Sequence, residues 1–272
     1  MEVKSEIFRE YDYSSVSITN GNVISKYRFN MPTIERDEKP LEYDNENDLV
    51  VQRKRNEIIE IEHKKSSKLS EVGLQLWRGA FLLNDFILST QHLFNDKIVL
   101  ELGSGVGITS IVASIVAKKV LCTDINIAGI LDLIKRNLKL NSHYQRTKNN
   151  IEVHELDFFA EKWSDQLELA IKDVDICLAA DVIYENDITN GLIKSILKLF
   201  NKSKKLKEMY MALEKRYVFT DKVLAPMYEC FIRMFSQQTA GILKISECPT
   251  DFPQYFEYDR CKELVLFRIT KI

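Results

Sequence analysis

A glycine-rich turn at residues 101–107, Glu-Leu-Gly-Ser-Gly-Val-Gly, constrains the fold of this chain more than any other feature of the sequence. The mostly apolar residues 97–102 lead into its first glycine and are typical of a buried strand, and the mostly apolar residues 109–116 follow it as a buried helix. Glycines let the backbone turn tightly and let a ligand come closer than a Cβ would permit. Strand, turn and helix together predict a ligand-binding unit of a parallel sheet.

Strand and helix patterns alternate along the rest of the chain. Further strands are expected at residues 120–124, 151–156, 174–180 and 209–214. Helices are expected at residues 71–87, 127–138, 188–200 and 224–235, and Ser70 is the expected N-cap of the first. Residues 241–247 and 263–270 have no helix between them, which indicates an antiparallel hairpin. The pattern predicts an α/β fold with a mostly parallel seven-stranded sheet, helices on both faces and a C-terminal hairpin.

The first part of the chain differs from the rest in composition. It has acidic patches such as residues 44–48, and two short alternating stretches, 23–29 and 58–62, that predict strands. The segment between these strands has the composition of a loop or a disordered linker. We therefore expect residues 1–57 to be an N-terminal appendage, partly disordered or packed on the core, and residues 58–272 to be the main domain.

Composition excludes several classes of protein. Lys plus Arg number 38 and Asp plus Glu number 40, so the net charge of −2 argues against a dedicated nucleic-acid binder. No apolar run reaches the ~18 residues of a membrane span, and the start of the chain lacks a secretory signal. The five cysteines form no C-x-x-C pair and are expected to be reduced thiols. The four histidines show no H-E-x-x-H spacing, so no metal site is expected.

Two acidic residues suggest what the glycine turn binds. Glu101 places an acid where the ammonium group of a ligand would lie, and Gly107 comes one place earlier than in the dinucleotide fingerprint. This form favours a nucleoside carrying an amino acid over a pyrophosphate. Asp124 ends the next strand, where a carboxylate can accept hydrogen bonds from both ribose hydroxyls. A turn without a ligand, and a helix cap at Asp124, are the alternative interpretations.

Other candidate residues follow strands that end at the same edge of the sheet. Phe158 is placed to cover an adenine face or to pack in the core. The small side chain of Ala180 leaves room for the ligand. Asp181 and Tyr184 come next, above the ligand and where a second reactant would enter; a helix cap and a packed aromatic are their structural alternatives. Trp77 is either a core residue or a lid over the amino-acid end of the ligand.

The ordered set of motifs resembles the intracellular protein lysine methyltransferases that share an Asp-x-x-Tyr or Asp-x-x-Phe signature after the fourth strand. The matching pieces are residues 71–80, 101–107, 122–124, 155–157, 180–184, 214–216 and 252–254. The resemblance covers roughly residues 58–272. It implies a class I, Rossmann-like methyltransferase fold, S-adenosylmethionine as the cofactor and a lysine side chain of another protein as the methyl acceptor.

The resemblance also implies roles for individual residues. Those expected to contact S-adenosylmethionine are Trp77, Gly103, Ser104, Gly105, Asp124, Phe158 and Ala180. Asp181 and Tyr184 are expected to border the lysine channel. Phe158 stands where relatives often carry tryptophan, and the region before Ile58 has no counterpart. The resemblance points to the nucleus or cytoplasm, with nucleic-acid-binding proteins among the candidate substrates.

The motifs also bear on other possible functions. A nucleic-acid base methyltransferase is disfavoured, because residues 180–184 read Ala-Asp-Val-Ile-Tyr instead of Asn-Pro-Pro-Tyr and no Pro-Cys nucleophile lies at that edge. The basic runs at residues 53–55 and 202–207 fit solvated faces. The glycine spacing disfavours an NAD-dependent oxidoreductase. A catalytically silent cofactor-binding adaptor and a methyltransferase acting on a non-protein substrate stay open.

Overall fold

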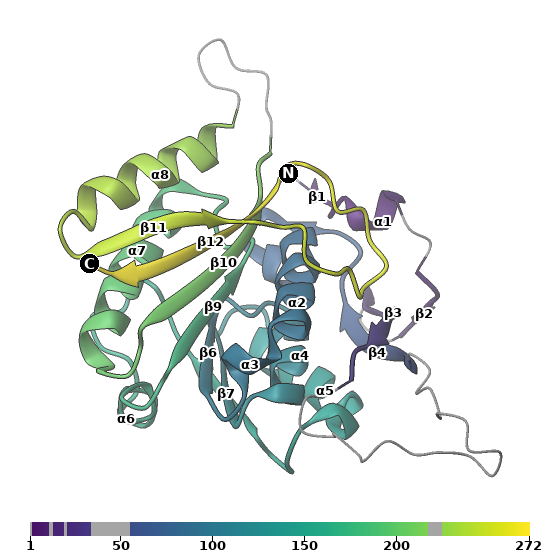
Figure 1. Cartoon of the computed structure of the whole chain (residues 1–272). Coiled ribbons are helices and arrows are strands. Elements are labelled where there is room, and N and C mark those ends of the chain that lie inside the picture. The colour runs from purple at the N-terminus through teal and green to yellow at the C-terminus, as the bar shows by residue number, and fades with distance from the viewer. Residues whose placement is uncertain (1, 11–12, 19–20, 34–54, 217–224) are drawn as a thin grey trace.

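The computed structural model describes residues 2–10, 13–18, 21–33, 55–216 and 225–272, and its centre is a seven-stranded sheet (Figure 1). The strand order is β11-β12-β10-β9-β6-β7-β8. The strands are β6 (Ile98–Leu102), β7 (Lys119–Asp124), β8 (Ile151–Glu155), β9 (Ile176–Ala180), β10 (Glu208–Glu214), β11 (Leu243–Cys248) and β12 (Leu264–Lys271).

Five of these strands are parallel, and β12 runs antiparallel to both β10 and β11. The central strand β6 is covered on both faces: Val99, Leu100 and Leu102 are fully buried. This is why parallel strands read as continuous apolar runs in the sequence. The predicted mostly parallel seven-stranded sheet with a C-terminal antiparallel hairpin is confirmed.

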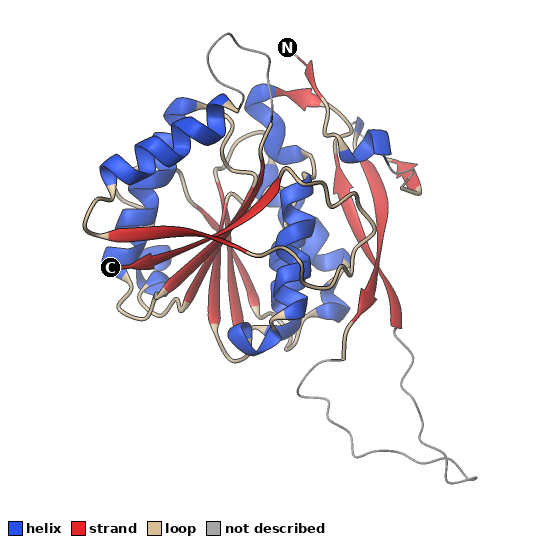
Figure 2. Cartoon of the chain, turned by 45° about the horizontal axis from the view of Figure 1, so that its top comes forward, coloured by secondary structure: helices blue, strands red, loops and turns tan. Residues whose placement is uncertain are grey.

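Helices cover both faces of the sheet, and Figure 2 shows the strands between two groups of helices. One core contains apolar residues of α2 (Arg78–Ser89), α4 (Ile108–Val116) and α5 (Ile130–Leu140), with the short α3 (Gln91–Phe94) beside them. The opposite core contains residues of α6 (Asp165–Ile171), α7 (Asn186–Lys202) and α8 (Pro226–Gln238). Within the residues described, no helix has the length and apolar character needed to span a bilayer.

The helix expected at residues 71–87 is divided in two, and the prediction of Ser70 as its N-cap is wrong. A 3-10 helix, η2 (Leu69–Leu74), is followed by extended backbone at Gln75, and α2 begins only at Arg78 with Trp77 as its N-cap. The Gln75 side chain holds the break by donating hydrogen bonds to Val3 and Ser67 and accepting one from the Ser5 N–H, and partners outside the helix are not revealed by periodicity.

Two further helices differ from the prediction. The helix expected at residues 127–138 starts at Ile130, because Gly129 adopts a left-handed φ of 75° as its N-cap. Ile127 therefore lies before the helix and is half exposed. The sequence analysis missed α6, whose start is marked by a side-chain hydrogen bond from the Leu167 N–H to the Ser164 Oγ.

The two strands predicted in the N-terminal part are confirmed and are longer than expected. β3 (Val23–Met31) pairs antiparallel with β4 (Arg55–His63), and β2 (Ser15–Ser17) pairs with β3. Tyr27 and Ile59 belong to the same apolar core as α2 and α4. The linker expected between the two strands lies, from residue 34 to residue 54, outside the described residues. The boundary predicted at residue 58 falls within β4, and the division into an appendage and a main domain stays a prediction.

The start of the chain also packs beside the sheet. β1 (Glu2–Val3) pairs with β5 (Ser67–Lys68), and the single turn α1 (Ile7–Glu10) follows β1. The side chain of Ile7 is 1% exposed and joins the main core. This segment lies immediately behind η2, which borders the pocket described next.

Candidate active site

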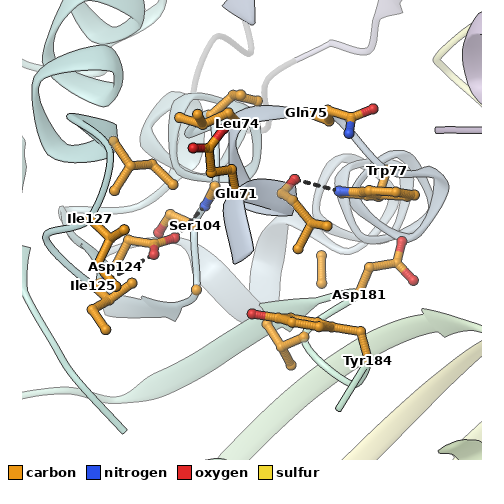
Figure 3. A pocket seen from close by; sticks show the side chains of 18 of the residues that line it. Glu71, Leu74, Gln75, Trp77, Ser104, Asp124, Ile125, Ile127, Asp181 and Tyr184 are labelled. Carbon is orange, nitrogen blue, oxygen red and sulfur yellow. Dashed lines mark hydrogen bonds between the residues drawn. The ribbon is translucent and has the colours of Figure 1, made fainter. Parts of the chain in front are cut away.

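A cavity of about 300 Å³ opens at the carboxyl ends of β6, β7 and β9, where open α/β sheets bind ligands. All ten residues predicted as site residues line it: Trp77, Glu101, Gly103, Ser104, Gly105, Asp124, Phe158, Ala180, Asp181 and Tyr184. In Figure 3, Ser104 and Asp124 lie at one end, and Trp77, Asp181 and Tyr184 lie at the other.

The glycine turn brings the backbone against the cavity. Gly103 and Gly105 have φ angles of 61° and 54°, in the left-handed region that favours glycine. A Cβ on Gly105 would lie 3.0 Å from the carbonyl oxygen of Gly73, which belongs to η2 on the facing wall. The turn therefore needs glycine both for its backbone angle and for the close approach of a second segment.

Asp124 is tied to this turn by backbone amides. Its Oδ2 accepts a hydrogen bond from the Gly105 N–H at 2.7 Å, and its Oδ1 accepts one from the Ile125 N–H at 2.7 Å. Burial raises its pKa to about 6. The alternative of a helix cap does not apply, because the N-cap of α5 is Gly129. Asp124 is thus a fixed carboxylate at the pocket.

Glu101 lies deeper, at 2% exposure, and its Oε2 accepts a hydrogen bond from the Ser110 hydroxyl at 2.5 Å. Burial raises its pKa to about 7, and the neighbouring Asp124 adds to the shift. A carboxyl this poorly solvated gains from a cationic partner, because the partner stabilises its charged form.

Between pH 4.5 and pH 8, the ligand-free unsubstituted chain is expected to lose on the order of 3 kcal/mol of its free energy of unfolding through Glu101. Glu101→Gln is expected to abolish this loss. The folded-state pKa of about 7 lies above the ordinary 4.5, so the native state binds more protons between these values. Its free energy of unfolding therefore falls as the pH rises from 4.5 to 7. Chemical denaturation at pH 5 and pH 8 measures the difference, and an unchanged pH dependence in the variant would contradict it.

Asp181 holds together two elements at the acceptor end of the cavity. Its Oδ2 accepts a hydrogen bond from the Gly79 N–H at 2.6 Å, at the start of α2, and its Oδ1 accepts one from the Glu214 N–H at 3.1 Å, at the end of β10. A Cβ on Gly79 would lie 2.6 Å from Oδ2, so this approach requires glycine. Asp181 is not a helix cap, because Glu185 is the N-cap of α7.

An ion pair lies behind Asp181. Arg78 Nη1 is 2.7 Å from Glu214 Oε1, and the two side chains are 5% and 10% exposed. Burial raises the pKa of Glu214 to about 7, and the charge of Asp181 raises it further while Arg78 lowers it. A buried ion pair therefore lies behind Asp181, and neither of its two side chains lines the cavity.

The aromatic candidates divide between packing and the cavity. Trp77 donates a hydrogen bond from Nε1 to the Val72 carbonyl at 2.9 Å, which fixes its ring at the rim. Tyr184 has its pKa raised to about 12 by burial, so its hydroxyl stays neutral. Phe158 packs against Gly191 of α7, where an added Cβ would lie 3.1 Å from the Cβ of Phe158. Phe158 also lines the cavity.

One wall of the pocket is formed by residues 69–77, all of which line it. The family resemblance includes residues 71–80, but Trp77 is the one residue of this wall that the sequence predicts to contact the ligand. Three large apolar residues at the rim are not predicted as site residues: Leu69, Ile127 and Phe159 are 46%, 49% and 59% exposed. Such exposure of apolar residues beside a cavity is a signal for a ligand with apolar surface. In the sequence, however, Ile127 matches the period of the following helix.

Comparison with known proteins identifies the family. The family model described as lysine methyltransferase matches residues 53–229 of this chain. The chain belongs to the lysine methyltransferase family. The resemblance inferred from the motifs is thereby confirmed, and the glycine turn, Asp124 and Asp181 all fall within the match.

Among the members of this family, the motifs of this chain look most like methyltransferase-like protein 22, and the comparison with that protein confirms the likeness. The human protein of that name is 35% identical over 234 residues, which is 79% of this chain and 58% of the human protein. The mouse protein-lysine methyltransferase METTL21E is 31% identical over 159 residues, 55% of this chain and 61% of that protein. This chain thus spans less than two thirds of the length of these relatives.

Among solved structures, the ribosomal protein L11 methylase from Lactobacillus delbrueckii subsp. bulgaricus is similar, with a TM-score of 0.44 and 16% identity. The similarity covers 71% of this chain and 77% of that one. Across the described parts of this chain, no group of three or more His, Cys, Asp and Glu is arranged to hold a metal ion.

Proposed function

We propose that this member of the lysine methyltransferase family transfers methyl groups from S-adenosylmethionine to a lysine side chain of another protein. The observation that carries the proposal is the convergence of all ten predicted site residues on one cavity at the strand ends. Family membership supports the same reaction. The match covers 58% of the human relative, so the activity and substrate of the whole human protein do not by themselves apply to this chain.

The residues of the cavity fit this cofactor. Two of the oxygen lone pairs of Asp124 are used by backbone amides, which leaves acceptor capacity for ribose hydroxyls. Glu101 and Asp181 supply negative charge for a ligand with an ammonium and a sulfonium group. The exposed apolar rim at Ile127 and Phe159 suits the faces of an adenine. Bound there, S-adenosylmethionine supplies an activated methyl group on a positively charged sulfur.

The acceptor lysine must be neutral to react. At a pKa of about 10.4, only ~0.1% of a free lysine is neutral at pH 7, which corresponds to about 4 to 5 kcal/mol. Desolvation in the cavity and a nearby positive charge both lower that pKa. Asp181 acts in the opposite direction, because a carboxylate favours the ammonium. We assign Asp181 the role of orienting the amine and helping its proton to leave, from a position that two backbone N–H groups hold fixed.

Tyr184 is assigned to shaping the lysine channel, and two substitutions test this. Tyr184→Phe is expected to keep the rate within a few-fold of the unsubstituted enzyme, because a hydroxyl with a pKa of about 12 stays protonated near pH 7 and cannot take the proton from the lysine ammonium. Tyr184→Ala is expected to lower kcat by roughly 10- to 100-fold, because the amine loses the surface that positions it. Methylation kinetics at saturating cofactor measure both, and equal rates for the two variants would refute the assignment.

Transfer of labelled methyl groups tests the reaction itself. Purified protein is incubated with labelled S-adenosylmethionine and cell lysate, and the label is located by mass spectrometry. Methyl-lysine in protein supports the proposal. Cofactor binding without transfer would indicate a silent adaptor, and label in nucleic acid or a small molecule would indicate a different acceptor class.

Location and substrate are proposed on the resemblance alone. We propose that the protein acts in the nucleus or cytoplasm, that its substrates include nucleic-acid-binding proteins, and that it does not bind nucleic acid itself. Residues 1–57 are proposed as an appendage to a catalytic domain at residues 58–272. Mass spectrometry of the methyl-lysine sites lost when the protein is removed from cells would identify the substrates.

A further inference from the structure

The wall of the pocket formed by residues 69–77 is held from behind by the first residues of the chain. Glu2 lies opposite Lys68 and Val3 opposite Ser67 in the antiparallel β1–β5 pair. Of the described residues 2–8, here called the N-terminal segment, none lines the pocket. Any effect of this segment on a ligand must therefore pass through the wall.

Gln75 joins the N-terminal segment to the wall. Its side chain is buried, at 1% exposure of the residue. Its Oε1 accepts a hydrogen bond from the Ser5 N–H at 2.9 Å, and its Nε2 donates to the Val3 carbonyl at 3.0 Å and to the Ser67 Oγ at 2.7 Å. Gln75 itself lines the pocket, two residues before Trp77. One buried amide thus links three separate stretches of the chain.

The N-terminal segment is itself anchored to the main core. Ile7 is buried in that core, and the ring of Phe8 stacks on His63 with centroids 4.8 Å apart and planes 7° apart. The segment can therefore act as a brace, because its far side is packed against β4 and not left in solvent.

A second contact reaches the end of the wall. Glu6 Oε2 lies 3.9 Å from Arg216 Nη2, and the guanidinium of Arg216 lies 4.5 Å from the centroid of the Trp77 ring. Cation–π contacts of this kind stabilise the orientation of an aromatic ring. The N-terminal segment thus contacts the wall at Gln75, and Glu6 contacts the Arg216 guanidinium that lies over Trp77.

Displacement of the wall would reach the cofactor site directly. Gly73 of the wall faces Gly105 so closely that a Cβ on Gly105 would lie 3.0 Å from the Gly73 carbonyl oxygen. The glycine turn and the wall are therefore in close contact at these two glycines, and both line the cavity beside that contact.

We propose that the N-terminal segment sets the affinity of the pocket for S-adenosylmethionine, and that Gln75 is the positioning residue through which it acts. This inference rests on the proposed function for the identity of the ligand. The family match begins at residue 53, so the brace belongs to a part of the chain that the match does not cover.

Hydrogen–deuterium exchange on the full chain tests the coupling without any substitution. Because coupling between two sites is reciprocal, S-adenosylhomocysteine bound in the pocket should slow amide exchange in residues 2–8. The Ser5 N–H, which donates to Gln75, should respond most. Binding of S-adenosylhomocysteine with unchanged exchange in residues 2–8 would overturn the inference. No binding at all by the unsubstituted chain would instead overturn the proposed function.

Gln75→Leu tests the positioning residue. The KM for S-adenosylmethionine is expected to rise about tenfold while kcat at saturating cofactor stays within about twofold, the pattern of lost uniform binding. Gln91→Leu is the matched control: Gln91 is also buried, at 6% exposure, and its amide donates to Thr33 and Leu88, away from the pocket. The control should lower stability without changing the KM.

Fluorescence gives a readout that stability alone would not move. The chain has two tryptophans, so a Trp163→Phe background leaves Trp77 as the reporter. Gln75→Leu should shift the Trp77 emission in the folded protein, and Gln91→Leu should not. An unchanged emission and KM in Gln75→Leu would contradict the positioning role. If that variant fails to fold, the exchange experiment on the unsubstituted chain decides alone.

Discussion

Asp181→Ala is expected to lower the rate of methyl transfer at least about 100-fold while cofactor binding persists. The substitution removes the carboxylate assigned to orient the amine. It also removes the acceptor that holds the Gly79 and Glu214 N–H groups at fixed positions beside the cavity. Loss of these backbone hydrogen bonds should lower the free energy of unfolding by about 1–3 kcal/mol per unsatisfied group. Single-turnover methylation measures the rate of methyl transfer, and calorimetric titration with S-adenosylhomocysteine measures whether cofactor binding persists.

Two controls accompany this variant. Asp181→Asn keeps one acceptor oxygen and suits the left-handed φ of 51°, so an intermediate rate is expected. Asp187→Ala removes an exposed acid from the first turn of α7 and should leave the rate unchanged. If the Asp181→Ala protein is folded, binds cofactor and methylates at full rate, Asp181 has no part in the reaction.

Asp124→Ala is expected to weaken cofactor binding about 100-fold or more. Two hydrogen bonds from ribose hydroxyls to a charged acceptor contribute about 1.5–3 kcal/mol each, and each 1.4 kcal/mol corresponds to about tenfold in affinity. The glycine turn also loses its link to the Asp124 Oδ2. Calorimetric titration measures the dissociation constant, and near-normal affinity in a folded variant would remove Asp124 from the cofactor site.

The pH dependence of binding gives an independent check on Asp124. Because its pKa is raised to about 6, the unsubstituted protein should bind cofactor more weakly as the pH falls below 6, when the protonated carboxyl loses acceptor capacity. Asp132→Ala is a suitable control, because this acid of α5 is exposed and forms an ion pair with Lys135 on the surface. It should bind the cofactor as the unsubstituted chain does.

The strands of the central sheet and the edge that carries the site could be predicted from the sequence. Parallel buried strands leave continuous apolar runs, and the residues that follow them meet at one edge whatever the loops between them do. This is why Glu101, Asp124 and Asp181 could be assigned to one pocket before their contacts were known. Their roles as site residues stay predictions that the experiments above test.

The contacts that depend on distant segments could not be predicted. Asp181 is hydrogen-bonded to Gly79, 102 residues away, and Gln75 is hydrogen-bonded to Ser5, 70 residues away. Periodicity describes neighbours along one element, so it placed Ile127 in a helix and joined residues 71–87 into one. Tertiary hydrogen bonds at Gln75 and the left-handed Gly129 decided otherwise.

The order of the last two strands has a consequence for how the molecule is assembled. β12 lies between β10 and β11 and pairs with both. Until residues 264–271 are in place, β10 has an unpaired side and β11 has no neighbour in the sheet. Once β10 (Glu208–Glu214) has paired with β9, its other edge therefore stays open until residues 264–271 have been synthesised and docked, and open strand edges invite pairing with other chains. Docking of β12 covers this edge of β10 and gives β11 its neighbour in the sheet, so one strand removes both unpaired edges at once.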